Sequence, residues 1–173
     1  MKRLIILMFF SAAAVLSGCS MHHPQNAQEF RTAAVASSMA SIETIEVKRP
    51  YKKVVKTFKK YTDKCLAKAY EITSCVNGAC STSVQTYTPT LISTRAGTEL
   101  HLQLDMSNMM NVSTVSEIPE NGMYVLVLDA VPVGKKTTKI ELYSGKWGYS
   151  GIKKAVKGWA SGEVKGCPDL TRT

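Results

Sequence analysis

The sequence contains few residues of the kinds that perform chemistry. It has three histidines, and its 13 acidic residues are outnumbered by 22 basic ones among 173 residues. It also lacks a G-x-S-x-G nucleophile motif, a glycine-rich phosphate loop, an H-E-x-x-H zinc motif and a C-x-x-C dithiol pair. These absences remove the commonest hydrolase, nucleotide-binding and thiol-redox signatures. We therefore predict no catalytic residue, no cofactor and no enzymatic activity.

The residues that could still act in catalysis or metal binding have simpler interpretations. His22 and His23 lie near the N-terminus, outside the predicted domain. His101 shares the polar face of a predicted strand with Glu99 and Asp105, where general acid–base catalysis is the alternative, but we interpret it as a solvent-exposed side chain. Three nearby methionines could bind Cu(I), yet we interpret them as flexible apolar filler and predict no metal site: Met106, Met109 and Met110.

A long apolar run without charges occurs only at the N-terminus. The chain opens MKRLIILMFFSAAAVLSGCS, in which Lys2 and Arg3 precede an apolar stretch at residues 4–10 and then small residues. This stretch is too short to span a bilayer and has the pattern of an export signal. Its removal lowers the formal net charge of +9 by two, and the exported chain stays clearly basic.

The end of this segment, Leu-Ser-Gly-Cys at residues 16–19, resembles the lipobox of bacterial lipoproteins. The resemblance implies that residues 1–18 are a signal peptide and that Cys19 becomes acylated after cleavage. Ser20, which stands where Asp would favour retention in the inner membrane, implies sorting to the outer membrane. We therefore expect a protein anchored to the outer membrane by its lipid and facing the periplasm, since several acyl chains give stable anchoring.

The composition divides the rest of the chain into two parts. The residues that follow Cys19 are small and polar without a clear period, so we predict a flexible tether over residues 19–40. Residues 41–173 are long enough to form one domain with a single core.

The four remaining cysteines are expected to form two disulfides in an oxidising compartment. Of the three possible pairings, geometry favours one. Residues 75–80 read CVNGAC, and a two-residue Asn-Gly turn places Cys75 directly opposite Cys80. Cys65 and Cys167 then remain, and their bond closes a loop of about 100 residues, worth ~4.7 kcal/mol in the loop-entropy model. The spacing lacks the paired C-x₂₋₄-C motifs of a four-thiolate zinc site, so no metal is expected.

Hydrophobic periodicity predicts an α+β domain. The segment at 98–106 alternates cleanly, with leucines on the core face and polar residues facing solvent, and the apolar run at 123–133 indicates a central strand covered on both faces. Two amphipathic helices can bury their apolar faces against one face of a single antiparallel sheet of about 6–7 strands. The predicted helices cover residues 51–66 and 151–160, and the predicted strands cover 41–48, 70–75, 80–87, 90–94, 98–106, 123–133 and 136–143.

This order of elements is similar to the helix-grip domains of the START-like superfamily and of BamC-like outer-membrane assembly lipoproteins. The resemblance covers residues 41–160. It implies the fold alone and assigns no functional residue.

The first predicted helix has a strongly basic face. It can bind anionic material such as an acidic envelope protein, peptidoglycan or anionic lipid, whereas nucleic acid is not expected in this compartment. The simpler interpretation is a solvated face that keeps the domain soluble. We expect a non-enzymatic binding, adaptor or assembly-stabilising lipoprotein. The alternative is a carrier of a small hydrophobic ligand between the sheet and the last helix, which bears Trp159. The residues of the basic face are Lys52, Lys53, Lys56, Lys59, Lys60 and Lys64.

Overall fold

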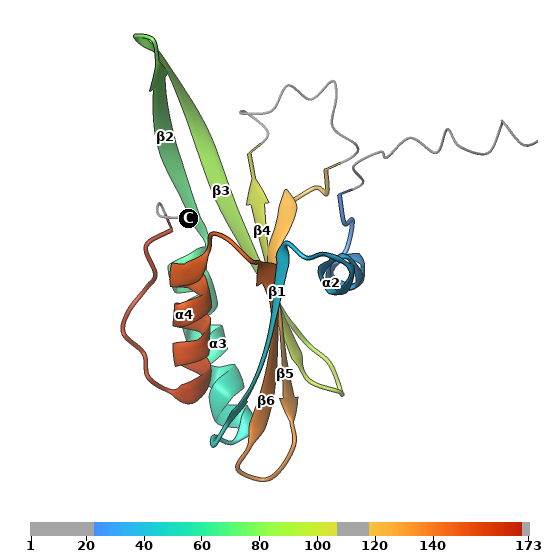
Figure 1. The fold of residues 1–173 in the computed structure, drawn as a ribbon. Helices are drawn as coiled ribbons and strands as arrows, with labels where there is room; N and C mark the ends of the chain where they lie inside the picture. The colour runs from blue at the N-terminus through green and yellow to red at the C-terminus, as the bar shows by residue number, and fades with distance from the viewer. Residues whose placement is uncertain (1–22, 107–117, 171–173) are drawn as a thin grey trace, which may run out of the picture.

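The computed structural model describes residues 23–106 and 118–170, and within them it contains one six-stranded antiparallel sheet and three helices (Figure 1). The strand order is β1-β6-β5-β4-β3-β2. The α+β class and the single antiparallel sheet are confirmed. The elements are α2 (Ala27–Ala36), β1 (Ala40–Val47), α3 (Tyr51–Leu66), β2 (Lys68–Val76), β3 (Ala79–Ser93), β4 (Thr98–Asp105), β5 (Met123–Pro132), β6 (Thr138–Gly145) and α4 (Ser150–Ser161).

Helices α3 and α4 lie side by side on one face of the sheet, and the main core lies beneath them (Figure 1). Pro50 precedes α3, where its fixed φ suits a helix start and its missing N–H leaves no bond unmade. Apolar side chains spaced three and four residues apart then turn toward the sheet, as the sequence predicts. The fully buried ones include Val54, Phe58 and Leu66 of α3, Val156 and Trp159 of α4, and Leu100, Leu102, Leu126, Leu128 and Ile140 of the sheet.

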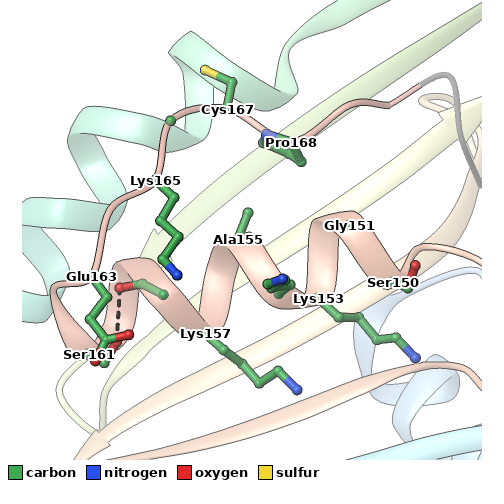
Figure 2. Close-up of a pocket in the computed structure, with 13 residues that line it drawn as sticks. Ser150, Gly151, Lys153, Ala155, Lys157, Ser161, Glu163, Lys165, Cys167 and Pro168 are labelled. Carbon is green, nitrogen blue, oxygen red and sulfur yellow. Dashed lines mark hydrogen bonds between the residues drawn. The ribbon is translucent and has the colours of Figure 1, made fainter.

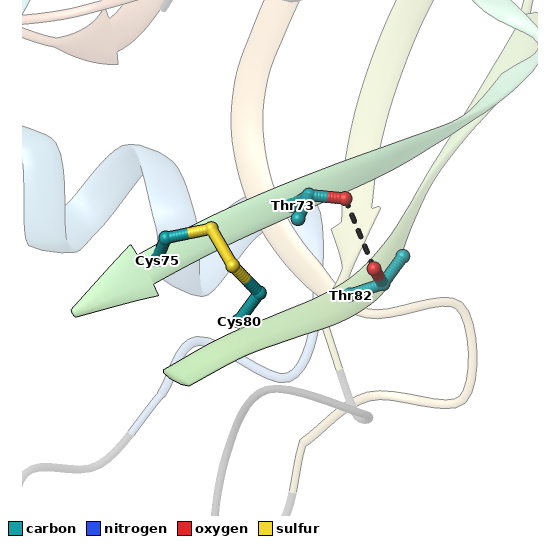
Figure 3. The surroundings of a disulfide bond; sticks show 4 residues. All are labelled: Thr73, Cys75, Cys80 and Thr82. Atoms are coloured by element: carbon teal, nitrogen blue, oxygen red, sulfur yellow. Dashed lines mark hydrogen bonds between the residues drawn. A yellow bond between two sulfur atoms is a disulfide. The ribbon is translucent and has the colours of Figure 1, made fainter. Parts of the chain in front are cut away.

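The β2–β3 hairpin has the predicted turn and register. Asn77 and Gly78 both have positive φ, 50° and 81°, as a type I′ turn requires. Cys75 therefore lies opposite Cys80 and forms a disulfide with it, and the hydroxyls of Thr73 and Thr82 are 2.9 Å apart on the same hairpin (Figure 3). The second predicted disulfide, between Cys65 and Cys167, is also present.

The segment around Pro89 differs from the sequence-based prediction. Residues 80–87 and 90–94 belong to one continuous strand, β3, instead of two. Proline is tolerated here because β2 pairs with β3 only as far as Tyr87, so that at Pro89 the strand has β4 as its one neighbour. The missing N–H therefore interrupts no ladder on the β2 side.

The prediction of a flexible tether over residues 19–40 is wrong for its second half. Residues 27–36 form α2, which lies on the sheet face opposite α3 and α4 (Figure 1), and β1 begins at Ala40. Asn26 starts the helix, because its side-chain oxygen accepts from the Glu29 N–H at 2.9 Å while its amide donates to the Glu29 carboxylate at 2.7 Å. The apolar side of α2 consists mainly of alanine, which makes its period weak in the sequence.

Polar side chains of β4 that alternation along the strand places on the outer face are buried, because α2 lies on that face of the sheet. His101 is only 8% exposed, and its ring meets that of Tyr124 edge-on with centroids 6.0 Å apart. The prediction that His101 faces solvent is therefore wrong. Gln103 on the same face is buried as well, and its amide donates to the Gly122 carbonyl at 3.0 Å.

Among the residues described, no helix has the length and apolar character needed to cross a membrane.

Candidate functional site

The basic face predicted for the first helix is present on α3, and we call it the basic surface. All six of its lysines are solvent-exposed, and none of them forms an ion pair within the part of the chain that the structure describes. The Lys60 ammonium lies 5.3 Å from the ring centroid of Tyr61. The positive charge of this surface is therefore available to a partner. Its residues are Lys52, Lys53, Lys56, Lys59, Lys60 and Lys64.

A cleft of about 600 Å³ lies between α4 and the segment at residues 163–168 (Figure 2). Four lysines and one acidic residue, Glu163, contribute to its lining. Figure 2 shows Lys165 extending from the C-terminal segment toward α4. Because the lining carries an excess of positive charge, the cleft favours anionic groups. The lysines are Lys153, Lys154, Lys157 and Lys165.

Two of these four lysines already have partners. The Lys157 ammonium lies 2.7 Å from the Glu43 carboxylate of β1, and the Lys153 ammonium donates to the Gly145 carbonyl at 3.4 Å. The hydrogen bond from Lys157 is the main reason that the pKa of Glu43 is lowered from its ordinary value, against the opposing effect of burial. Lys154 and Lys165 form no ion pair with the described residues, so their positive charge stays available in the cleft.

Small residues on the outer side of α4 allow the C-terminal segment to lie close to it. A Cβ added at Gly158 would stand 2.8 Å from the Glu163 carbonyl oxygen. A Cβ added at Gly151 would stand 3.5 Å from the backbone carbonyl oxygen of Asp169. The segment is held at its far end by buried Leu170 and by the disulfide of Cys167. The cleft was not predicted, although the small residues at 151, 155 and 158 were a signal for a groove on α4.

A second polar cluster lies on the opposite face of the sheet, where Arg31 of α2 meets two carboxylates. Its guanidinium binds both oxygens of Asp129, at 2.9 and 2.5 Å, and one oxygen of Glu99 at 2.5 Å. Glu99 also contacts Nε2 of His101 at 2.9 Å. Burial alone would raise the pKa of Glu99, but the hydrogen bonds from Arg31 and His101 outweigh it and lower that pKa. Since the carboxylates face the arginine, this arrangement holds α2 on the sheet.

The space between α4 and the sheet, where the alternative hypothesis places a ligand, is occupied by side chains around Trp159. The Trp159 indole has no exposed surface and stacks on Tyr61, with ring centroids 5.8 Å apart. Ile152 and Val156 are buried beside it. The carrier hypothesis stays a prediction without a supporting cavity at this position.

The remaining predicted residues have these positions. Cys19 and His22 lie outside the described residues, as do Met109 and Met110, so the structure places neither the lipid site nor the methionine loop. Met106 is partly buried against the core. Within the described part of the chain, no group of three or more His, Cys, Asp or Glu side chains is arranged to hold a metal ion.

No model of a known protein family, no curated protein and no solved structure matches this chain. The fold and the positions of charged side chains therefore carry the functional argument.

Proposed function

We propose that this protein is a non-enzymatic envelope lipoprotein, anchored to the outer membrane through Cys19, that binds an anionic envelope partner through the basic surface of α3. The observation that carries the proposal is the set of exposed lysines on this one helix, none of which forms an ion pair with another described residue. The partner chemistry that fits is clustered negative charge, as on an acidic protein, peptidoglycan or anionic lipid.

The spacing of these lysines supports a binding role over simple solubility. Lys52, Lys56, Lys60 and Lys64 follow one another at intervals of four residues, so each of these residues lies about one helical turn from the next. Like charges at this spacing destabilise a helix by roughly 0.2–0.5 kcal/mol per pair. A partner with negative charge relieves this repulsion, whereas a soluble surface is obtained equally well with charges of both signs.

Sedimentation with isolated peptidoglycan sacculi and capture of proteins from solubilised envelope would test the proposal with the detergent-solubilised protein. A Cys19→Ser form, which carries no acyl chain, allows the same comparison with anionic vesicles. Binding to one of these materials should fall as salt is raised, because exposed charges are screened. Lys56→Glu combined with Lys59→Glu should weaken binding about 10-fold or more, since a lysine near an anionic surface contributes about 1 kcal/mol.

The matched control is Lys135→Glu combined with Lys136→Glu, which changes the charge equally but lies in the exposed β5–β6 turn. This control should bind as the wild type does. If both double variants bind equally well, or if the wild type binds none of the three materials, the proposal is wrong.

A further inference from the structure

A cluster of exposed apolar side chains lies at the end of the sheet where β1 begins and β6 ends. Trp147 is 71% exposed and Met39 is 61% exposed. They are close together, because the Lys146 N–H donates to the Met39 carbonyl at 2.7 Å. Val35, in the last turn of α2, is 72% exposed and precedes Met39 by four residues. We call Val35, Met39, Lys146 and Trp147 the interfacial patch.

The N-terminal part of the described chain meets the body of the protein beside this patch. Pro24 lines a shallow depression together with Met39 and Gly145, and His23 lines an adjoining one with Gly145 and Tyr149. The first described residue, His23, therefore lies across a depression from Gly145, the last residue of β6, which directly precedes Lys146 and Trp147 in the chain.

The short distance along the chain between Cys19 and His23 limits how far the patch can lie from an anchoring membrane. Four Cα–Cα steps separate the two residues, and at 3.8 Å each they reach at most ~15 Å. A lipid on Cys19 thus keeps its bilayer within about this reach of His23, on the side of the molecule where the interfacial patch lies. A flexible tether of twenty residues would have imposed no such restriction.

We infer that the interfacial patch rests on the surface of the membrane that holds the Cys19 lipid, with the Trp147 ring at the level of the lipid headgroups. This inference rests on the lipid anchor of the proposed function. Tryptophan favours this region because its ring is apolar and its N–H is polar, and a lysine beside it adds attraction to anionic headgroups.

Tryptophan quenching can test the inference on the full lipidated protein reconstituted into phosphatidylethanolamine and phosphatidylglycerol vesicles. Acyl chains brominated near their headgroup end quench an indole that lies at the boundary between headgroups and acyl chains. The sequence has two tryptophans, and Trp159 has no exposed surface, so only Trp147 should respond. In brominated vesicles, wild-type emission should fall by up to about two-fold relative to unbrominated vesicles, as expected for one interfacial indole of two. The variant Trp147→Phe should lose none of its emission.

Flotation of the vesicles shows whether the lipid anchors the protein, independently of whether Trp147 contacts the membrane. A protein that floats with the vesicles but emits equally in both lipids overturns the inference and leaves the anchor standing. Quenching of Trp147→Phe equal to that of the wild type also overturns it, because the quenched indole would then be Trp159. A protein that does not float overturns the anchor and the inference together. The binding test of the lysine variants on sacculi does not involve Trp147. The binding role of the basic surface and the membrane contact of the interfacial patch can therefore be disproved separately.

Discussion

At the scale of single residues, Arg49 joins the end of β1 to both helices of the core. Its guanidinium donates to the Trp159 carbonyl at 2.8 Å, to the Ala160 carbonyl at 3.3 Å and to the Thr57 hydroxyl at 2.8 Å. The last carbonyls of a helix have no partner within it, and they form the negative end of the helix dipole, so a cation here satisfies both needs. Gly162, which ends α4 with φ of 91°, leaves room for this guanidinium 3.3 Å from where a Cβ would stand.

Replacing this arginine should destabilise the fold. Arg49→Ala leaves the α4 carbonyls and the Thr57 hydroxyl without their charged donor, and it should lower the free energy of unfolding by about 2–3 kcal/mol. Urea unfolding followed by circular dichroism measures this change. Arg95→Ala, which removes an exposed arginine from the β3–β4 turn, should stay within about 0.5 kcal/mol of the wild type. Equal stability of the two variants would contradict the role assigned to Arg49.

At the scale of elements, α2 is held to the sheet by few contacts, and those contacts depend on charge. The helix is 10 residues long and buries Ala27 and Ala34, while Phe30 lies against Tyr124 with ring centroids 6.0 Å apart. Because its apolar contact is small, the ion pairs of Arg31 with Glu99 and Asp129 carry more of its attachment. Helices α3 and α4 are attached differently, through large apolar side chains.

This attachment predicts a loss of stability in acid. The folded protein lowers the pKa of Glu99 below its ordinary value of 4.5, so the unfolded chain takes up a proton first as the pH falls. The stabilisation is complete above pH 4.5 and disappears as the pH drops through the lowered pKa. Urea unfolding at pH 7 and pH 3 should therefore show a smaller pH-dependent loss for Glu99→Gln than for the wild type.

The control for this comparison is Glu120→Gln, an exposed carboxylate in the turn before β5. It should follow the pH dependence of the wild type. If Glu99→Gln loses as much stability in acid as the wild type does, the Arg31 cluster does not fasten α2 in the way described.

At the scale of the whole molecule, the two disulfides constrain very different lengths of chain. Cys65 and Cys167 are 102 residues apart and connect the end of α3 to the C-terminal segment, whereas Cys75 and Cys80 are 5 residues apart within one hairpin. The loop-entropy model assigns about 4.7 kcal/mol to a loop of the first length and roughly 2 kcal/mol to the second. The long connection also holds the segment that forms one wall of the cleft beside α4.

Removal of each bond by paired alanine substitution should separate these contributions. Cys65→Ala with Cys167→Ala should lower the free energy of unfolding by about 4–5 kcal/mol, and Cys75→Ala with Cys80→Ala by about 2 kcal/mol or less. Urea unfolding of the oxidised proteins measures both. The hairpin pair serves as the control because it ties no distant segments together. A larger loss from the hairpin variant than from the long-range one would contradict this order.

Features that depend on a few neighbouring residues could be predicted from the sequence. The Asn-Gly turn sets the register of its own hairpin, so the pairing of Cys75 with Cys80 follows from local geometry. The lysines of α3 share a face because a helix repeats every 3.6 residues, whatever packs on its other side. For the same reason the basic surface was predictable. The placement of both amphipathic helices on one sheet face was predicted on a different ground, because each has one apolar stripe that must be buried against the sheet.

Features that depend on contacts between distant residues were decided only by the tertiary structure. Asn26 and Glu29 form a helix-start pattern, but the docking of α2 requires Arg31 to meet Asp129, 98 residues away. That contact also decides that His101 is covered, since alternation along a strand shows which residues share a face and not what covers it. The cleft beside α4 and the patch around Trp147 likewise arise where chain segments meet. The sequence by itself determined most of the local elements, the hairpin disulfide and the basic helix face, because these follow from short-range periodicity and turn geometry, and the Cys65–Cys167 pair followed from it only by elimination. The cover of the second sheet face, the cleft and the interfacial patch were decided by long-range packing.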